Sequence, residues 1–345
     1  MAVNDEFWTE LQRFTEKIRQ EFAANEGGAL VNYDKELIKK NAEATGEALI
    51  GLGSKRSSRR FAILLHTLAQ SYQHVNDDTF ATRRDVYYES VWLYRSQTAV
   101  DKSAEDLARM MVVPRHGLHL TITGKGLVAG CLCYITHDDT IVDVQQAQAG
   151  VMVPDCVEGL KEVISDARYI LVIEKDATFQ KLVEAHIHRS FGPAILITGK
   201  GYPDLPTRQF LYRLWTDLKI PVLALTDADP YGLHIAAVYK FGALARDEPG
   251  LAVHNLAWLG VLPSDLIALQ LPPYALLPLT PQDHGKLASL AAHPAISGSP
   301  QWLQQIEDQK KLGHKAEIQS LVHITPDFLT SVYLPTKLRQ GGWIA

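Results

Sequence analysis

The sequence predicts a two-part protein in which a mainly helical α+β part precedes an α/β part with a parallel sheet. Helix-like apolar spacing dominates up to about residue 115, and from about residue 165 apolar runs alternate with helical stretches. The chain of 345 residues, 46% of them hydrophobic, is long enough to bury about two cores. We expect an N-terminal helical extension at 1–58, a first domain at 59–155 and a second domain at 165–345.

The first part is expected to be built mainly from helices. Apolar residues at three- and four-residue spacing predict helices over residues 5–23, 33–48, 59–72, 82–95 and 103–111. Ser103 followed by Asp106 has the spacing of a capping box at the start of the last helix. A basic cluster, Lys55, Arg56, Arg59 and Arg60, is open to two interpretations, a solvated linker or a contact with phosphates.

A winged-helix (helix-turn-helix) module is expected near the end of this part. Residues 106–118 have the pattern of a helix, a turn and the start of a second helix. Two β-like runs follow at 118–123 and 127–135, and Gly124-Lys125-Gly126 between them predicts a hairpin, which would be the wing. Helix-turn-helix spacing is common in unrelated folds, so this assignment is a hypothesis.

In the second part, strands and helices alternate. Strands are expected at 169–173, 194–198 and 221–226, and helices at 177–189, 205–218 and 232–241. This alternation predicts a mostly parallel sheet with helices on its faces. Beyond Pro263 the chain is expected to be helical and punctuated by prolines.

Three acidic residues follow two of the expected strands. Glu174 follows the first strand, and Asp227 and Asp229 follow the third. Ligands of parallel α/β sheets collect beyond the carboxyl ends of the strands, and the two aspartates point the same way if the strand continues through them. Mg²⁺ prefers such oxygen ligands, so one interpretation of the three acids is a magnesium site. The alternative is that the acids cap the helices that follow them.

The Glu…Asp-x-Asp arrangement resembles that of the Toprim fold, which topoisomerases, bacterial primases and some nucleases share. The resemblance implies phosphodiester chemistry that depends on Mg²⁺, with Mn²⁺ as an alternative ion. It assigns residues 165–345 to a Toprim metal-binding domain and leaves the choice among those activities open.

A candidate nucleophile lies on the helix expected at 82–95. Tyr87, Val91 and Tyr94 share one apolar stripe, while Arg84, Tyr88 and Arg95 share the neighbouring one. A free phenol, with a pKa of about 10, is a poor nucleophile at neutral pH, and guanidinium groups favour the phenolate and bind phosphate. The alternative is that Tyr88 is a packed amphipathic residue.

Residues 84–88, Arg-Asp-Val-Tyr-Tyr, resemble the catalytic-tyrosine motif of the topoisomerase VI A-subunit family, which includes the meiotic double-strand-break proteins. The resemblance continues in order to residue 345, through residues 125–130, 150–154, 174–179, 198–204, 227–232, 258–260, 263–265, 315–319 and 333–335. Residues 174–178 and 341–344 are closer to the meiotic proteins than to the archaeal subunits. The first fifty or so residues match little.

The resemblance implies that Tyr88 attacks a backbone phosphorus and becomes joined to the 5′ phosphate, and that Arg84 orients this phosphate. Glu174, Asp227 and Asp229 would hold the metal. One tyrosine cuts one strand, so a double-strand break requires a homodimer. The implied partners are double-stranded DNA, meiotic accessory proteins and a topoisomerase VI B-like subunit. The implied location is the chromosomes in the nucleus.

Basic residues in the matching motifs are candidate DNA contacts, namely Lys125, Lys200 and Arg208. Ordinary surface charge is the alternative, and the net charge of −5 does not itself indicate a nucleic-acid partner.

We expect no membrane span, because the apolar runs fall short of roughly 20 residues, and no secretory signal. The three cysteines are expected to be reduced and buried.

Three rival functions use the same motifs. The chain could be an archaeal-type topoisomerase VI A subunit, or a Toprim hydrolase or primase in which water or a nucleotide replaces Tyr88 as the nucleophile. It could also be a scaffold that binds DNA without covalent cleavage. The hydrolase or primase keeps the metal site, and the scaffold needs neither the metal nor Tyr88.

Overall fold

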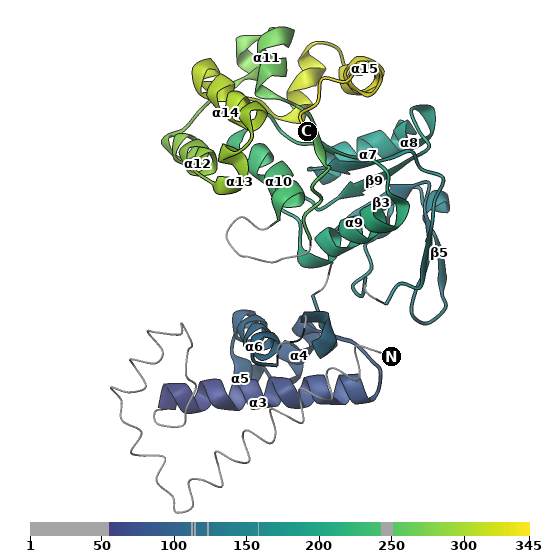
Figure 1. The fold of residues 1–345 in the computed structure, drawn as a ribbon, viewed down its shortest axis with the longest axis vertical. Helices are drawn as coiled ribbons and strands as arrows, with labels where there is room; N and C mark the ends of the chain where they lie inside the picture. Colours follow the sequence, from purple (N-terminus) through teal and green to yellow (C-terminus); the bar gives the residue numbers. More distant parts are fainter. Residues whose placement is uncertain (1–54, 112, 114, 123, 158, 243–250) are drawn as a thin grey trace, which may run out of the picture. The chain divides into compact units, whose positions relative to one another are not determined.

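A computed structural model describes residues 55–111, 113, 115–122, 124–157, 159–242 and 251–345 (Figure 1). The chain divides into two compact units, Met1–Thr123 and Gly124–Ala345. The division expected after residue 155 lies instead after Thr123, so residues 124–155 belong to the second unit and not to the first. The helices expected at 5–23 and 33–48 lie outside the described residues, as does nearly all of the expected extension at 1–58.

The described part of the first unit is mainly helical, as expected. Its elements are α3 (Lys55–Asn76), β1 (Ala81–Thr82), α4 (Arg83–Glu89), α5 (Val91–Tyr94), α6 (Gln97–Met110), the 3₁₀ helix η1 (Arg115–Leu118) and β2 (Leu120–Thr121). Val86, Tyr94, Leu107 and Met111 are among the buried residues of its core.

Two residues of the basic cluster, Arg59 and Arg60, make contacts within the first unit. Arg59 belongs to α3 and donates to the carbonyl oxygens of Leu93 and Tyr94, both at 3.0 Å. Arg60, on the same helix, forms an ion pair with Asp106 at 2.7 Å. The linker interpretation is therefore wrong for these two arginines, because they tie α3 to the rest of its own unit.

A side-chain capping signal marks the start of α4 but not of α6, whose N-cap Ser96 makes no side-chain capping bond. The capping box expected at Ser103 is wrong, because Ser103 lies inside α6 and its hydroxyl donates to Thr67 Oγ1 at 2.9 Å. A capping box forms instead between Thr82 and Asp85 at the start of α4. The single helix expected at 82–95 is interrupted at Ser90, whose φ of −137° is not helical, so α4 and α5 are separate.

The expected wing hairpin is not formed. β2 pairs in parallel with β1 inside the first unit, whereas β3 (Leu127–Gly130) joins the main sheet of the second unit. The second run ends early because Gly130 takes a φ of +103°, and β4 (Cys133–Ile135) belongs to a different sheet. Residues 124–126, where the turn was expected, are therefore the start of the second unit. The second helix of the expected helix-turn-helix is the four-residue η1.

A six-stranded sheet forms the centre of the second unit, in the order β11-β10-β8-β9-β3-β6 (Figure 1). The strands not yet placed are β6 (Val151–Met152), β8 (Tyr169–Ile173), β9 (Ala194–Thr198), β10 (Val222–Leu225) and β11 (Ala257–Gly260). β11, β10, β8 and β9 are parallel, while β3 is antiparallel to both β9 and β6. The prediction of a mostly parallel sheet is confirmed.

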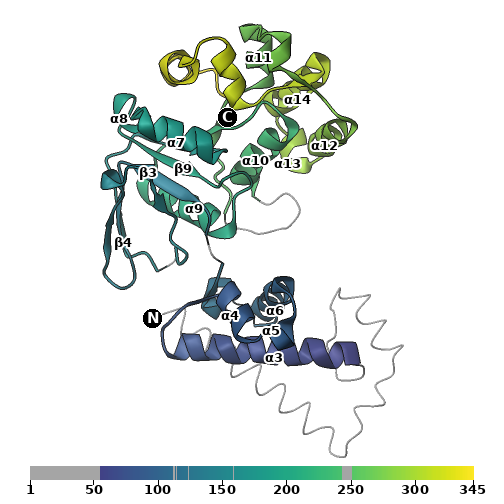
Figure 2. The ribbon, with the colours of Figure 1, turned by 180° about the vertical axis from the view of Figure 1, so that it is seen from behind.

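Helices cover both faces of this sheet, so the second unit has three layers (Figures 1 and 2). Alternate residues of β8 enter two different cores, Ile170 and Val172 on one face and Leu171 and Ile173 on the other. The first core is closed by α9 (Leu205–Leu218) and α10 (Pro230–Phe241), the second by α7 (Asp176–Glu184) and the short helix α8 (Ile187–Ser190). Because both faces are buried, the strands are continuously apolar.

The rest of the second unit completes these layers. A small sheet, in the order β5-β4-β7, adds β5 (Ile141–Asp143) and β7 (Glu162–Ile164), and η2 (Val144–Gln146) follows β5. The C-terminal elements are α11 (Pro263–Leu269), η3 (Pro273–Ala275), β12 (Leu277–Pro278), α12 (Pro281–Ala291), α13 (Pro294–Ser297), α14 (Pro300–Leu312), β13 (His314–Lys315), η4 (Ile318–His323), the π-helix η5 (Leu329–Tyr333) and α15 (Leu334–Gln340). Prolines in the first turns of these helices confirm the expected punctuation.

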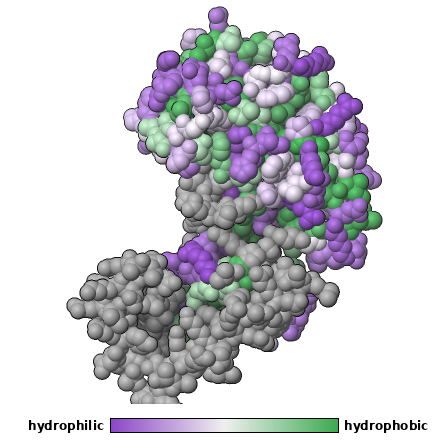
Figure 3. Space-filling model, in the orientation of Figure 1, coloured by the Kyte–Doolittle hydropathy of each residue, from purple (hydrophilic) through white to green (hydrophobic). Residues whose placement is uncertain are grey.

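On the face of the second unit drawn in Figure 3, hydrophilic and hydrophobic residues are interspersed. None of the described helices has the length and apolarity required to cross a bilayer. All three cysteines are free, but only Cys131 is buried, whereas Cys133 and Cys156 are half-buried.

Candidate active site

Glu174 and Asp227 meet at the carboxyl edge of the central sheet. β8 and β10 are neighbours in register, with Ile173 opposite Leu225, so the residues that follow the two strands emerge together. The backbone N–H of Asp227 donates to Glu174 Oε2 at 2.8 Å. The alternation of strands and helices predicted this convergence, and neither side chain caps the helix that follows it.

Both carboxyl groups of this pair are largely removed from water, since Glu174 is 8% exposed and Asp227 is 4% exposed. Burial and the nearby Asp227 carboxylate raise the pKa of Glu174 to about 8. Burial also raises the pKa of Asp227, although the ammonium of Lys175 and the N–H of Ile318 oppose this shift. The pair therefore favours protonation or the approach of positive charge.

Positive charge is supplied by Lys175, the residue directly after Glu174. Its ammonium lies 2.8 Å from Asp227 Oδ2 and 3.0 Å from Glu317 Oε2. Burial lowers the pKa of Lys175, but the ion pairs with Asp227 and Glu317 outweigh this effect and raise it. The backbone N–H of Ile318 donates to Asp227 Oδ1 at 2.8 Å.

Lys175, Glu317 and Ile318 were not among the residues predicted for the site, although all lie in motifs that carry the resemblance. Strand and helix periodicity could not find them, because the segment at 315–319 lies some 90 residues beyond Asp227 in the chain. The isolated bridge between Ala228 and Ala316 brings that segment to the site.

The condition under which Asp229 and Asp227 were expected to point the same way is not met, because β10 ends at Leu225, before both residues. Asp229 is the N-cap of α10, and its Oδ1 accepts from the N–H groups of Tyr231 and Gly232 at 2.9 and 2.6 Å. The capping alternative therefore describes Asp229, and not Glu174 or Asp227. Asp229 is near enough for its charge to raise the pKa of both other acids.

The carboxylate oxygens of Glu174 and Asp227 are suited to binding a hard divalent cation. Carboxylate oxygens are the preferred ligands of Mg²⁺, and this buried pair holds more negative charge than Lys175 alone neutralises when both acids are ionised. Within the described residues, however, no three acidic, histidine or cysteine side chains already stand in a metal-holding arrangement. Asp229 is engaged with its own helix, and Lys175 takes one oxygen of Asp227.

The raised pKa of Glu174 predicts how pH affects the metal-free protein. The folded state binds a proton more tightly than the unfolded state between the ordinary pKa of 4.5 and the raised value of about 8. The free energy of unfolding is therefore expected to fall as pH rises through this window, by about 1 kcal/mol per pH unit from this group. Thermal unfolding in EDTA between pH 5 and 8 measures the slope.

Glu174→Gln is the matched variant for this measurement, because the amide resembles the protonated acid and its oxygen can still accept from Asp227. The slope should flatten in Glu174→Gln. An equal slope in both proteins would show that other groups cause the pH dependence.

Tyr88 lies in the first unit, near the end of α4, with 60% of its surface exposed. The Arg84 guanidinium carbon lies 5.7 Å from the centre of the Tyr88 ring, and hydrogen bonding and charge interaction with Tyr88 raise the pKa of Arg84. Tyr87 is half-buried and packs against the core of the unit, as its apolar stripe predicts. Tyr94 is buried in the same core, as the stripe also predicts, but the interruption at Ser90 leaves Val91 exposed. Arg95, in a left-handed conformation, ends α5.

Of the three basic candidates, Lys125 and Lys200 come together in the second unit. Lys125 Nζ donates to the carbonyl oxygen of Lys200 at 3.3 Å, and Lys200 Nζ lies 3.4 Å from Asp176 Oδ2. Arg208, by contrast, is 6% exposed on α9. Its burial disfavours the contact with DNA that the sequence suggested, and the two lysines are the better candidates.

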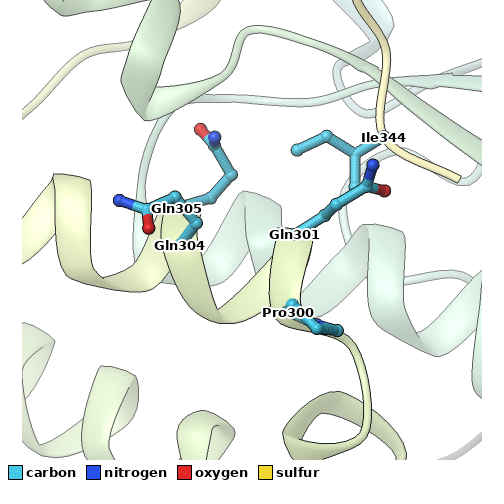
Figure 4. A pocket seen from close by; sticks show the side chains of 5 residues that line it. All are labelled: Pro300, Gln301, Gln304, Gln305 and Ile344. Atoms are coloured by element: carbon cyan, nitrogen blue, oxygen red, sulfur yellow. The ribbon is translucent and has the colours of Figure 1, made fainter.

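The pocket in Figure 4 is not part of this arrangement. It has a volume of about 290 Å³ and is lined by Pro300, Gln301, Gln304, Gln305 and Ile344. None of the predicted site residues lines it. This pocket therefore does not include the acid pair or Tyr88.

Comparisons with known proteins match the same two regions. A family model for the Toprim domain shared by Spo11 and the A subunit of topoisomerase 6 matches residues 169–338, and one described as "Type IIB DNA topoisomerase" matches residues 59–120. The chain is 42% identical to meiotic recombination protein SPO11 of Mus musculus over 293 residues, which are 84% of this chain and 74% of that protein. It is 35% identical to the A subunit of DNA topoisomerase 6 from Arabidopsis thaliana over 293 residues, 84% of this chain and 68% of that protein.

Proposed function

Because this chain belongs to the family of Spo11 and the topoisomerase VI A subunit, we propose that it forms DNA double-strand breaks in meiotic recombination by a topoisomerase-like transesterification. The higher identity to the mouse meiotic protein than to the plant topoisomerase favours the meiotic role over that of an archaeal-type A subunit. The observation that carries the proposal is an exposed tyrosine, Tyr88, held beside Arg84 in the region that matches type IIB topoisomerases.

In the proposed reaction the Tyr88 oxygen attacks a backbone phosphorus. A bond forms between that oxygen and the 5′ phosphate, the bond from phosphorus to the 3′ oxygen breaks, and the 3′ oxygen leaves as a hydroxyl after taking up a proton. Arg84 binds the phosphate that Tyr88 attacks. The number of phosphodiester-type bonds is unchanged, so no energy source is consumed in the cut.

Glu174 and Asp227 would hold a Mg²⁺ or Mn²⁺ ion, with Asp229 as the third acid. Such an ion supplies electrostatic stabilisation of charge on the phosphate and the leaving oxygen. This assignment requires Asp229 to turn from the N-terminus of α10. The support for it is the buried, partly neutralised acid pair and the match to a Toprim domain.

A homodimer is the proposed active form, because each Tyr88 cuts one strand. The proposed partners are double-stranded DNA, which Lys125 and Lys200 contact through phosphates, meiotic accessory proteins and a topoisomerase VI B-like subunit. The proposed site of action is the chromosomes in the nucleus. In each active centre, Tyr88 of one protomer works with the acids of the other.

Mixing two inactive variants tests this arrangement. A heterodimer of Tyr88→Phe and Glu174→Gln protomers, purified through two different tags, keeps one intact centre if the tyrosine and the acids come from different protomers. It is expected to nick supercoiled DNA, while each variant alone does not. If both groups act within one protomer, neither centre is intact and the mixture should produce no nicked circles above the level of the single variants.

The covalent link itself is tested by incubating the wild-type protein and its B-like subunit with supercoiled DNA in Mg²⁺. After denaturation and protease digestion, mass spectrometry is expected to identify a peptide that contains Tyr88 attached to DNA 5′ ends. Metal-dependent cleavage without a protein–DNA link would favour the Toprim hydrolase. Binding without any cleavage in the complete assembly would favour the scaffold.

A further inference from the structure

The Lys175 ammonium connects two segments that are distant in sequence. It contacts Asp227 Oδ2 at 2.8 Å, on the connection between β10 and α10, and Glu317 Oε2 at 3.0 Å, in the segment just before η4. Lys175 Nζ also donates to Gln319 Oε1 at 3.3 Å. The Lys175 side chain is 27% exposed and that of Asp227 5% exposed, so the contact between them is sheltered from solvent, whereas Glu317 is 55% exposed.

These contacts occupy the carboxylate on which the metal depends. Asp227 Oδ1 accepts from the N–H of Ile318 at 2.8 Å, and Oδ2 faces the ammonium of Lys175. A divalent cation bound to Oδ2 would lie next to a second positive charge in a poorly solvated site, where like charges repel strongly. The ammonium and the metal therefore compete for the same oxygen.

We propose that Lys175 is the internal counter-ion of the acid pair, holding Asp227 in the metal-free protein and releasing Oδ2 when a divalent cation binds. Glu317 and Gln319 then retain the ammonium beside the site. Lys175 is thus a positioning residue that lowers metal affinity and keeps Asp227 paired until the metal arrives. The inference rests on the proposed function in one respect, that Asp227 binds a divalent cation.

Chemical labelling of the wild-type chain tests the release directly. Lys175 is expected to react several-fold faster with an acetylating reagent in saturating Mn²⁺ than in EDTA, as quantified by mass spectrometry. Lys337 is the matched internal control, because it pairs with Asp265 at 2.8 Å and is also sheltered, at 11% exposed. Lys337 should react equally in both conditions, and Asp227→Asn should make Lys175 reactive without metal.

Metal affinity provides a second test. Lys175→Met is expected to bind Mn²⁺ about tenfold more tightly in titration calorimetry, as expected for directly coupled charges. The gain in melting temperature on adding Mn²⁺ should be roughly 3 °C larger than in the wild type. Lys337→Met is the control that loses a comparable ion pair, and its affinity should equal that of the wild type. If Lys175→Met does not fold, the labelling of the wild-type chain still decides.

The outcomes separate this inference from the proposed function. If the wild-type protein binds no Mn²⁺ in calorimetry, the metal assignment itself fails. If it binds Mn²⁺ but Lys175 labelling is unchanged or falls, the counter-ion role is overturned and the metal assignment stands. Weaker or unchanged Mn²⁺ binding by Lys175→Met also overturns the counter-ion role.

Discussion

Replacing Tyr88 with phenylalanine is expected to abolish covalent attachment of the protein to DNA, and to reduce DNA cleavage by roughly 10⁴-fold or more. The substitution removes only the attacking oxygen. Because 60% of Tyr88 is exposed, stability should change by no more than about 0.5 kcal/mol. The measurement is the amount of protein linked to 5′ ends after incubation with supercoiled DNA, Mg²⁺ and the B-like subunit.

Tyr87 supplies the matched control for this experiment. It is the preceding residue, its ring centre lies 5.3 Å from that of Tyr88, and it packs against the core of the first unit. Tyr87→Phe keeps the packed ring, so cleavage should stay near the wild-type level. Cleavage that survives in Tyr88→Phe, or is lost equally in Tyr87→Phe, would remove Tyr88 from the role of nucleophile.

The second large effect is expected for Glu174→Gln, which should lower metal-dependent cleavage by at least about 10²-fold. The amide removes the negative charge that Glu174 would carry when a metal is bound, while its oxygen can still accept from the N–H of Asp227. In the metal-free protein near pH 7, Glu174 is already largely protonated, because its pKa is raised to about 8. The variant should therefore fold as well as the wild type, and its defect should appear only when the metal is needed.

Cleavage and DNA binding are measured together for this variant. DNA binding should stay within a few-fold of the wild type, because the phosphate contacts proposed for Lys125 and Lys200 are untouched. Asp265→Asn is the control, since it breaks the pairing with Lys337 and the hydrogen bond from the Tyr333 hydroxyl but lies outside the acid pair. Asp265→Asn should lower the thermal stability of the protein and leave the metal dependence of cleavage unchanged. Full cleavage by Glu174→Gln would favour chemistry that does not involve this acid.

Several strands and helices of the second unit could be predicted from the pattern of apolar residues within each segment. The apolar runs predicted at 169–173 and 194–198 are β8 and β9 with the same bounds, and the helix predicted at 205–218 is α9. These predictions succeed because a strand buried on both faces is continuously apolar and a surface helix has a repeating apolar face, so the signal lies within one segment. The same signal placed Glu174 and Asp227 at one edge of the sheet.

Features that depend on distant partners could not be predicted in this way. The run that begins at Leu127 has strand character, but only tertiary contacts decide that it pairs with β9 and not with β2. The side-chain direction of Asp229 depends on where β10 ends, and the helix after it competes for the carboxylate. The contact of Lys175 with Glu317 joins residues 142 positions apart, between which the sequence carries no local periodic relation.

The strands β8 and β9, the helix α9 and the acids at the strand ends follow from the sequence, because period and composition act over a few neighbouring residues. The sheet that each edge strand joins, the orientation of Asp229 and the pairing of Lys175 follow from the tertiary structure. These depend on which long-range partners satisfy buried backbone groups and charges once the chain is compact.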